Sequence, residues 1–351
     1  MAGGTGGHIY PALAVAEVLR ARGCKLYWLG SRRGMENRLV PAAGLPLLTI
    51  SVTGLRGAGV LRLLAAPFLL CLAVFQALSI MLRIRPQVVL GLGGFASGPG
   101  GVAAWLTHRP LVIHEQNAIP GVTNRLLSRI ATRVLEAFPH SFISATNAVF
   151  VGNPVREAIA ALPAPATRGT GLASPLRVLV FGGSLGARKL NQTVPAALAK
   201  CNGPFVVHHQ TGRSDDRDAI AAMYQAAGIP ANVEPYIEDM AAAYAGADLV
   251  ISRAGAMTIA ELAAAGLPAI LIPFPHAVDD HQTANARFLV DQGAALLVAE
   301  SALDVDALAE MISQLASDRT RLAAMAAKAH ALARTDATTS VADVCMEYCH
   351  G

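Results

Sequence analysis

The chain has 351 residues, which is enough for about two domains of roughly 150 residues each. Its 28 basic and 24 acidic side chains leave a net charge of +4, too small an imbalance to indicate a nucleic-acid partner. Hydrophobic residues make up 53% and charged residues 15% of the chain, which excludes a disordered protein. The five cysteines are scattered and odd in number, which favours reduced thiols over a disulfide framework.

The chain repeats one unit, in which a short apolar run leads through a glycine-rich turn into a stretch rich in alanine and leucine. The apolar runs predict strands at residues 25–29, 87–92, 110–114, 148–151, 177–181, 204–208, 248–252, 268–272 and 294–298. Such strands, alternating with helices, are typical of parallel sheets covered on both faces. Segment 162–175, rich in Pro, Gly and Ala, is a linker or a surface loop beside the hinge. We therefore expect an α/β protein with two Rossmann-like domains facing across a cleft. The last helix, near residues 338–348, could belong to either domain.

The first glycine-rich turn comes very early in the chain. A turn of this kind follows a strand in a parallel sheet, yet only Met1 and Ala2 precede it. We therefore expect a further strand of about five to eight mostly apolar residues upstream.

Residues 63–82 form a stretch without a charged side chain, long enough to cross a bilayer. Pro67, Gln76 and Ser79 weaken that interpretation, and arginines flank the stretch at both ends. A helix that lies on the membrane or packs on a sheet fits equally well. We expect peripheral attachment from Val60 to Arg85, with apolar side chains in the interface and arginines on anionic headgroups.

Three glycine-rich turns stand out: GGTGGH at 3–8, GGFASGPGG at 93–101 and GGSLGA at 182–187. Glycine lets the backbone approach a ligand closely, and the helix start that follows offers N–H groups to phosphate. None of the turns has the spacing of a dinucleotide fingerprint with its acidic residue, so a nicotinamide cofactor is not favoured. Three such turns spread over two domains favour two phosphate-bearing ligands in one cleft.

Polar residues gather where several predicted strands end. HEQN at 114–117 follows one strand, and Arg156 in GNPVR lies near the domain boundary, where it could meet a diphosphate. Loop capping and a solvated helix residue are the plainer alternatives. Glu261 follows another strand and turn, and Gln282 lies in a polar segment at 273–286 that suits sugar hydroxyls. There Asp279 and Asp280 could simply cap a helix.

Metal ligation is not favoured. Asp216 with Asp218, and Asp304 with Asp306, match a short D-x-D pattern, but both pairs fall in a predicted first helical turn, where acids stabilise the helix. His208 and His209 point to opposite faces of one predicted strand, so they do not chelate together.

These motifs, in this order and over essentially the whole chain, closely resemble the MurG family of N-acetylglucosaminyltransferases of bacterial peptidoglycan synthesis. The resemblance rests on GGTGGH, GLGGFASGPGG at 91–101, HEQN, GNPVR at 152–156, GGSLGARKLNQ at 182–192 and DDHQTANA at 279–286. It implies the glycosyltransferase B fold, with an acceptor- and membrane-side domain at 1–157, a UDP-GlcNAc-binding domain at 158–335 and a C-terminal helix at 336–351 packing back on the first domain.

The same resemblance implies the reaction and the cellular setting. GlcNAc passes from UDP-GlcNAc to the C4 hydroxyl of MurNAc in undecaprenyl-pyrophosphoryl-MurNAc-pentapeptide, with inversion and without a metal or cofactor. The product is the lipid-linked disaccharide, released with UDP. The protein would be peripheral on the cytoplasmic face of the inner membrane and would bind no nucleic acid.

Site residues are also carried over from the family. Donor contacts are implied for Thr5, Gly6, Gly7, Asn117, Arg156, Ser184, the Ile237 backbone near the uracil, Ala256, Met257, Thr258, Ile259, Ala260, Glu261 and Gln282. Of these, Glu261 would hold the ribose hydroxyls from a helix surface and Gln282 the GlcNAc hydroxyls. The acceptor diphosphate would meet the first-domain loops at Gly93, Gly94, Ser97 and Gly98. Phe95 replaces the tyrosine expected at its position.

By the same resemblance, His8 occupies the position proposed for the general base, and an imidazole suits that role because it accepts a proton near neutral pH. Glu115 is the next candidate. The alternative is that His8 only orders the loop or hydrogen-bonds the acceptor phosphate. Among whole-protein functions, a UDP-GlcNAc 2-epimerase is the nearest rival, followed by a non-catalytic sugar-nucleotide sensor at the membrane and a dehydrogenase.

Overall fold

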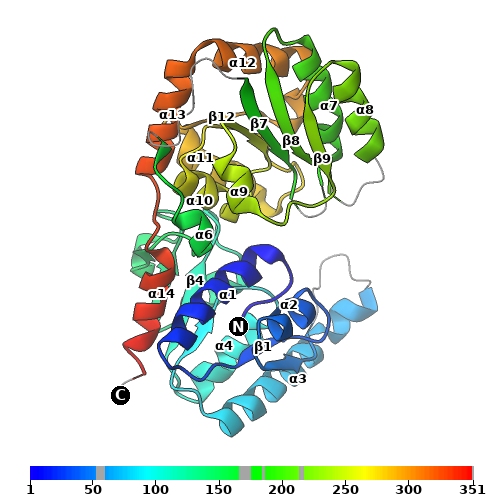
Figure 1. Ribbon diagram of the computed structural model, residues 1–351. Coiled ribbons are helices and arrows are strands. Elements are labelled where there is room, and N and C mark those ends of the chain that lie inside the picture. Colours follow the sequence, from blue (N-terminus) through cyan, green and yellow to red (C-terminus); the bar gives the residue numbers. More distant parts are fainter. Residues whose placement is uncertain (53–59, 166–174, 184–185, 213–216, 350–351) are drawn as a thin grey trace. The chain divides into compact units, whose positions relative to one another are not determined.

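The computed structural model describes residues 1–52, 60–165, 175–183, 186–212 and 217–349 (Figure 1). It divides into two compact units. Unit 1 comprises Met1–Arg156 and Thr335–Gly351, and unit 2 comprises Glu157–Arg334. The boundaries predicted from the sequence, at 157 and 335, lie next to these divisions.

Unit 1 is built from parallel strands and the helices between them. Its strands are β1 (Trp28–Ser31), β2 (Leu47–Ile50), β3 (Val89–Gly91), β4 (Leu111–Glu115), β5 (Arg133–Glu136) and β6 (Val149–Phe150). β1 pairs with β2, and the other four form a sheet in the order β3-β4-β5-β6. The helices are α1 (Gly6–Ala21), α2 (Glu36–Ala42), α3 (Val60–Ile84), α4 (Ser97–Leu106), α5 (Val122–Leu127), η1 (Ser144–Thr146) and α14 (Ala337–Met346). The last helix therefore belongs to unit 1, where Val341 and Cys345 pack against Val15 and Leu19 of α1.

Met1 and Ala2 run between the two sheets of unit 1. The Met1 amino group donates to the Leu90 carbonyl (2.6 Å), and the Leu92 N–H donates to the Met1 carbonyl (2.9 Å). On the other side, the Trp28 indole donates to the Ala2 carbonyl (2.9 Å). β1 and β3 are thus bridged by two residues without strand pairing, beside a cavity of about 530 Å³. The expected upstream strand stays a prediction.

Unit 2 holds one six-stranded parallel sheet, in the order β12-β11-β10-β7-β8-β9. Its strands are β7 (Leu176–Phe181), β8 (Phe205–Gln210), β9 (Ala231–Glu234), β10 (Leu249–Ser252), β11 (Ala269–Leu271) and β12 (Ala295–Leu297). The helices are α6 (Glu157–Ala160), α7 (Arg188–Lys200), α8 (Arg217–Ala226), α9 (Met240–Ala245), α10 (Ala256–Ala265), η3 (Val278–Asp280), α11 (His281–Val290), η4 (Glu300–Ala302), α12 (Val305–Ser317) and α13 (Arg319–Ala331).

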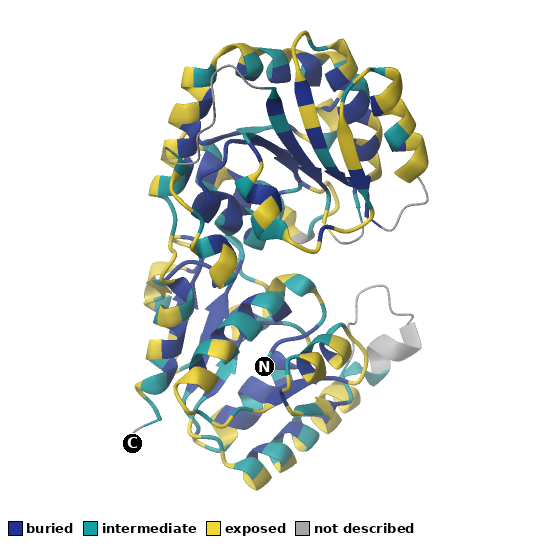
Figure 2. Cartoon of the chain, in the orientation of Figure 1, coloured by how far each residue is buried: buried dark blue, intermediate teal, exposed yellow. Residues whose placement is uncertain are grey.

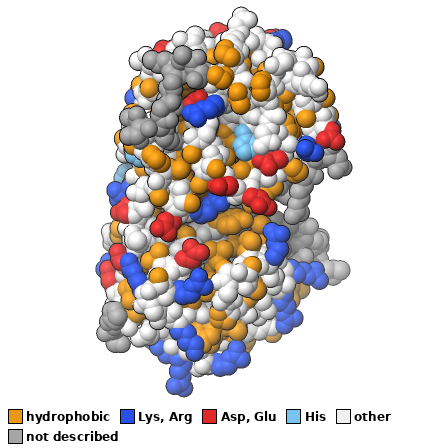
Figure 3. All heavy atoms as spheres, in the orientation of Figure 1, with side chains coloured by type: hydrophobic (Ala, Val, Ile, Leu, Met, Phe, Trp, Pro, Cys, Tyr) orange, Lys and Arg blue, Asp and Glu red, His pale blue; other side chains and the backbone are white. Residues whose placement is uncertain are grey.

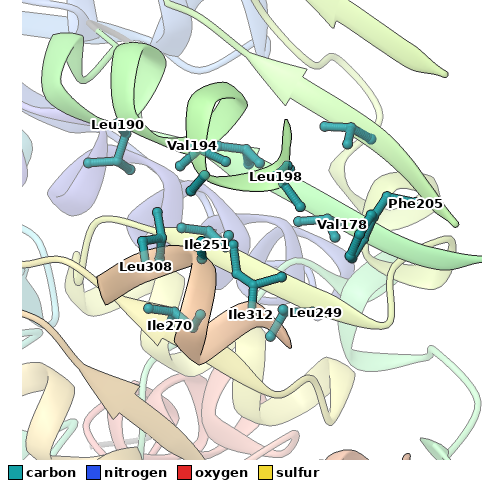
Figure 4. Close-up of a cluster of buried hydrophobic side chains, with 14 of the residues drawn as sticks. Val178, Leu190, Val194, Leu198, Phe205, Leu249, Ile251, Ile270, Leu308 and Ile312 are labelled. Atoms are coloured by element: carbon teal, nitrogen blue, oxygen red, sulfur yellow. The ribbon is translucent and has the colours of Figure 1, made fainter. Parts of the chain in front are cut away.

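One hydrophobic core of unit 2 lies between this sheet and helices that include α7, α8, α12 and α13; Figure 4 shows part of it. Leu190, Val194 and Leu198 recur every fourth residue on α7, so they line one helical face, and they pack over Val178 of β7. Leu308 and Ile312 of α12 join the same cluster. Each fully buried aliphatic side chain stabilises the fold by about 1.5–3 kcal/mol.

All nine predicted strands exist, with ends shifted by up to three residues. The largest shift is at β1, expected from residue 25 and observed from Trp28. Three further strands, β2, β5 and β9, were not predicted. The α/β prediction is confirmed, with every strand pair parallel in the described part of the chain.

Candidate active site

The buried carboxylate of Glu36 holds the first glycine loop in place. Gly4 has a φ of 91°, which glycine adopts without strain, and its N–H donates to Glu36 Oε2 (3.2 Å). The Ser31 N–H and hydroxyl donate to Glu36 Oε1 (3.0 and 2.5 Å), and Glu36 is fully buried. The loop then enters α1, so Thr5, Gly6 and Gly7 lie at a helix start whose N–H groups lack intrahelical partners.

The second glycine loop packs directly on the first. A Cβ on Gly94 would lie 2.2 Å from the Gly3 carbonyl oxygen, and one on Gly93 would lie 3.1 Å from His8 Cε1. The Ser97 hydroxyl donates to the Gly93 carbonyl (2.6 Å) and so orders its own loop. The structure thus brings the predicted acceptor loop, with Gly98 half-buried in α4, against the predicted base.

His8 is connected to the HEQN segment. His8 Nδ1 lies 2.7 Å from Gln116 Oε1, and Gln116 Nε2 lies 2.9 Å from both Nδ1 and the carbonyl oxygen of His114. His114 Nε2 in turn lies 2.8 Å from the Gly152 carbonyl oxygen. Burial lowers the pKa of His114 to about 4, so its ring is neutral near pH 7.

Glu115, the second candidate base, is buried and serves its own loop. Its Oε1 accepts from the backbone N–H (2.9 Å) and side-chain amide (3.2 Å) of Asn117. Its Oε2 accepts from the Gly121 N–H and the Asn124 amide, both at 3.0 Å. Because both carboxylate oxygens are engaged in ordering residues 116–124, the geometry favours His8 over Glu115 as the base.

The GNPVR segment closes unit 1 beside HEQN. The Asn153 amide donates to the Gln116 carbonyl (3.0 Å), and both residues are buried. Arg156 follows two residues after Pro154 and is half-buried at the end of unit 1.

In unit 2, the third glycine loop follows β7. Ser184 lies outside the described residues. Gly186 has a φ of 77°, and a Cβ on it would lie 2.2 Å from the Thr211 carbonyl oxygen, so only glycine fits. The loop leads to the start of α7 at Arg188, which offers N–H groups to an anion.

Helix α10 carries the predicted donor residues from Ala256 to Glu261. The expectation that Glu261 lies on a helix surface is wrong: it is 9% exposed and accepts a hydrogen bond from the Tyr244 hydroxyl (2.9 Å). The cause is α9, whose Tyr244 packs against α10 and is fully buried. Ile237 is buried just before α9, and Gln282 Oε1 accepts from the Phe274 N–H (2.9 Å).

The acidic pairs considered for metal behave as helix-start residues where they are described. Asp304 caps α12 by accepting from the N–H groups of Asp306 and Ala307, both at 2.9 Å. Asp216 lies outside the described residues, and Asp218 is in the first turn of α8. In the described ranges, no three His, Cys, Asp or Glu side chains are placed to hold a metal ion. His208 pairs with Glu234, whereas His209 is buried against Tyr224 and Asn191.

Helix α3 has one buried side and one exposed apolar side (Figure 2). Ala73, Ala77 and Met81, four residues apart, are buried in the unit 1 core. Phe68 is 79% and Phe75 70% exposed, and the other exposed large apolar residues of the helix are Leu69, Leu70, Leu72 and Leu82. The stretch Ala65–Ile84 is also the one described helix long and apolar enough to span a membrane.

Charge is divided unequally between the two units. Unit 1 carries 15 Lys and Arg against seven Asp and Glu, and unit 2 carries 13 against 17, which together make the 28 and 24 of the chain. On the face shown in Figure 3, basic side chains gather on the lower end, in unit 1, with hydrophobic ones between them.

Sequence reasoning singled out Glu115 and Asn117 within HEQN but missed the roles of His114 and Gln116. Their place at the carboxyl end of a buried strand was the available signal. Glu36 was missed because an acid in a first helical turn is ordinarily dipole compensation.

Residues 1–136 match the glycosyltransferase family 28 N-terminal domain, and residues 177–341 match the glycosyltransferase family 28 C-terminal domain. A relative from Alkalilimnicola ehrlichii is 56% identical over 99% of this chain and 97% of its own, and one from Aeromonas hydrophila is 53% identical over 100% and 96%. Both are named UDP-N-acetylglucosamine–N-acetylmuramyl-(pentapeptide) pyrophosphoryl-undecaprenol N-acetylglucosamine transferase.

Among solved structures, Acinetobacter baumannii MurG is 43% identical, with a TM-score of 0.89 over 99% of this chain and 98% of that one. The fold is therefore the glycosyltransferase B fold. From the family 28 domains in both units, the full-length relatives and this structural match, it follows that the chain belongs to the MurG family of glycosyltransferases.

Proposed function

We propose that this chain transfers GlcNAc, with inversion, from UDP-GlcNAc to the MurNAc C4 hydroxyl of undecaprenyl-pyrophosphoryl-MurNAc-pentapeptide. The observation that carries the proposal is the imidazole of His8, which stands at the start of α1 against the second glycine loop and bonds Gln116. An inverting transfer needs a base at the acceptor hydroxyl, and an imidazole supplies one near neutral pH.

The chemistry divides into a bond formed and a bond broken. The acceptor oxygen bonds to C1 of GlcNAc while the bond from C1 to the UDP oxygen breaks and its electron pair leaves with UDP. The hydroxyl proton passes to His8. The charge that develops on the diphosphate is stabilised by N–H groups at the start of α7 and by the Arg156 guanidinium.

The donor's other contacts come from the predicted residues of unit 2 and of HEQN. Glu261, whose Oε2 also accepts from the Tyr244 hydroxyl, would accept hydrogen bonds from the ribose hydroxyls, and the Ile237 backbone would meet the uracil. Gln282 would donate from its amide nitrogen to GlcNAc, because its oxygen is bonded to Phe274. Asn117, Thr5, Gly6 and Gly7 would complete the set.

The acceptor diphosphate would bind the glycine loop of unit 1. Gly93 and Gly94 both have a positive φ, which glycine adopts without strain, and Gly98 lies in the first turn of α4. Ser97 would act by ordering the loop, because its hydroxyl already bonds Gly93.

Attachment to the membrane would be peripheral, through the exposed side of α3. Phe68, Phe75 and the exposed leucines offer apolar area to the interface, while the excess of basic residues in unit 1 attracts anionic headgroups. A side that packs on unit 1 through Ala73 and Ala77 argues against a span surrounded by lipid. The protein would lie on the cytoplasmic face of the inner membrane.

The decisive experiment is a transfer assay with radiolabelled UDP-GlcNAc and lipid-linked MurNAc-pentapeptide. We expect label in the lipid product and one UDP released for each transfer, only when acceptor is present. Release of UDP without acceptor, or formation of a 2-epimer, would favour the epimerase. Binding of UDP-GlcNAc without any turnover would favour a sensor.

Membrane attachment has its own test, co-sedimentation with vesicles that contain anionic phospholipid. The double variant Phe68→Ser/Phe75→Ser should lose binding, and added salt should weaken the binding of the unchanged protein. Val206→Ser, which changes an exposed apolar residue of unit 2, is the matched control and should bind normally. Resistance to alkaline extraction would contradict peripheral attachment.

A further inference from the structure

A continuous chain of hydrogen bonds runs from the Gly152 carbonyl through His114 and Gln116 to His8. We propose that Gln116 and His114 are positioning residues that hold His8 with its proton on Nδ1 and its lone pair on Nε2. The inference rests on the proposed base role of His8, and it assigns a role to two buried residues.

The Gly152 carbonyl shows which nitrogen of His114 carries the proton. A carbonyl oxygen can only accept, so His114 Nε2, 2.8 Å from the Gly152 oxygen, must carry a proton. His114 is fully buried, and burial lowers its pKa to about 4. A neutral imidazole has one N–H only, so His114 Nδ1 is an acceptor.

The His114 carbonyl shows which end of the Gln116 amide is the NH₂ group. One end of the Gln116 amide lies 2.9 Å from the His114 carbonyl oxygen, which can only accept, so that end is the NH₂ group. The same group donates to His114 Nδ1 (2.9 Å), in agreement with the first step. The other end of the amide is therefore the oxygen.

The third step sets His8. Gln116 Oε1 faces His8 Nδ1 at 2.7 Å and can only accept, so His8 carries its proton on Nδ1. Nε2 then holds the lone pair that a general base needs. When Nε2 takes the acceptor proton, the bond from Nδ1 to Gln116 becomes charge-assisted and stronger, which stabilises the imidazolium.

Neighbouring residues hold His114, Gln116 and His8 in place. His114 and Gln116 are each at most 1% exposed, and the Asn153 amide holds the Gln116 backbone (3.0 Å). Gly93 lies against the His8 ring, where a side chain would displace it. The amide thus does for His8 what a carboxylate does in a catalytic triad, fixing tautomer and orientation, but without a charge.

The direct test is side-chain nitrogen NMR of the full chain with labelled histidine, the two rings being assigned from His8→Asn and His114→Asn variants. We expect the Nδ1–H tautomer for His8 and the Nε2–H tautomer for His114. A neutral His8 with its proton on Nε2 overturns the proposal, whatever the activity. This measurement uses the unchanged protein and needs no variant of Gln116 to fold.

The kinetic test is Gln116→Met, which keeps the length of the side chain but removes both the acceptor and the donor. We expect kcat to fall by about 10- to 100-fold with donor affinity unchanged, and the His8 resonances to show a mixture of tautomers. Gln87→Met changes an exposed glutamine of unit 1 and is the matched control.

The two proposals fail in different ways. If His8→Ala lowers kcat at least about 100-fold while Gln116→Met changes neither kcat nor the His8 tautomer, His8 is the base and the positioning role is overturned. If His8→Ala has little effect while NMR gives the expected tautomers, the base role fails and the hydrogen-bonded chain stands.

Discussion

His8 lies in the first turn of α1, and its replacement separates proton transfer from substrate binding. We expect His8→Ala to lower kcat by at least about 10²-fold, because general bases contribute about 10²–10⁴-fold in rate. UDP-GlcNAc affinity should change little, as measured by titration calorimetry. A loss under tenfold, or a loss confined to acceptor affinity, would give His8 the loop-ordering role instead. His108→Ala, in the same unit, serves as the control.

Glu261 accepts a hydrogen bond from Tyr244, and its proposed second partner is the donor ribose. Glu261→Ala should raise the donor KM, and because it leaves a buried hydroxyl without its acceptor, it should also destabilise unit 2 by about 1–3 kcal/mol. Donor kinetics and urea unfolding measure the two effects. Glu310→Ala, an exposed acid on α12, should change neither. An unaltered donor KM in Glu261→Ala would place this glutamate outside the donor site.

At the scale of elements, a matched pair of variants tests the contact between the two glycine loops of unit 1. Gly94 (φ 84°) and Gly23 (φ 83°) have nearly the same positive φ, but of the two only Gly94 has neighbours, the backbone atoms of Gly3, within 4 Å of a Cβ. Both alanine variants carry a penalty for the positive φ. We expect Gly94→Ala to be less stable than Gly23→Ala by at least about 1 kcal/mol in urea unfolding, because it overpacks the contact.

Equal free energies of unfolding for the two variants would show that the loops accommodate the added Cβ of Gly94→Ala without loss of stability. A further measurement distinguishes stability from function. Because Gly94 sits beside the loop that carries His8, Gly94→Ala should also lower kcat, whereas Gly23→Ala, at the far end of α1, should not.

The strands that escaped prediction share a physical cause. β9 begins with exposed Ala231 and Asn232, and β5 begins with exposed Arg133, so neither forms the continuous apolar run that marks a strand buried on both faces. β2 has only four residues, of which Ile50 alone is buried. Strands such as β7 and β10, buried almost throughout, were visible in the sequence.

For the whole molecule, each unit contains a histidine that is buried and neutral. Burial lowers the pKa of His114 in unit 1 to about 4 and that of His209 in unit 2 to about 3. An unfolded histidine titrates near pH 6.5, so below that pH the unfolded chain binds more protons than the folded one. Stability is therefore fully present above about pH 6.5 and is lost as pH falls towards 4, by about 1.4 kcal/mol per pH unit for each histidine.

Calorimetric Tm values between about pH 7 and pH 5 check this expectation. His209→Gln should flatten the pH dependence of unit 2, whereas His276→Gln, which alters an exposed histidine of the same unit, should leave it intact. A Tm that does not change over this range would contradict the neutral state of both buried rings.

The sequence pointed to loops that the structure brings together in unit 1, but it did not reveal the hydrogen bonds between them. His8 and Gln116 are 108 residues apart, and they meet only because the start of α1 packs beside the segment that follows β4. Glu36 supports the first loop from α2 in the same way. Glu261 was placed on a surface because α9, which buries it, contributes through a single tyrosine that helical periodicity does not reveal.

The exposed apolar side of α3 has a kinetic consequence. Under the proposed attachment through Phe68 and Phe75, the enzyme would meet a lipid-linked acceptor in two dimensions, so the relevant concentration would be molecules per unit of membrane area. Diluting the acceptor with inert phospholipid, at constant bulk concentration, should slow the reaction. The apparent acceptor KM should follow mole fraction in the bilayer, while the KM for the water-soluble donor stays constant.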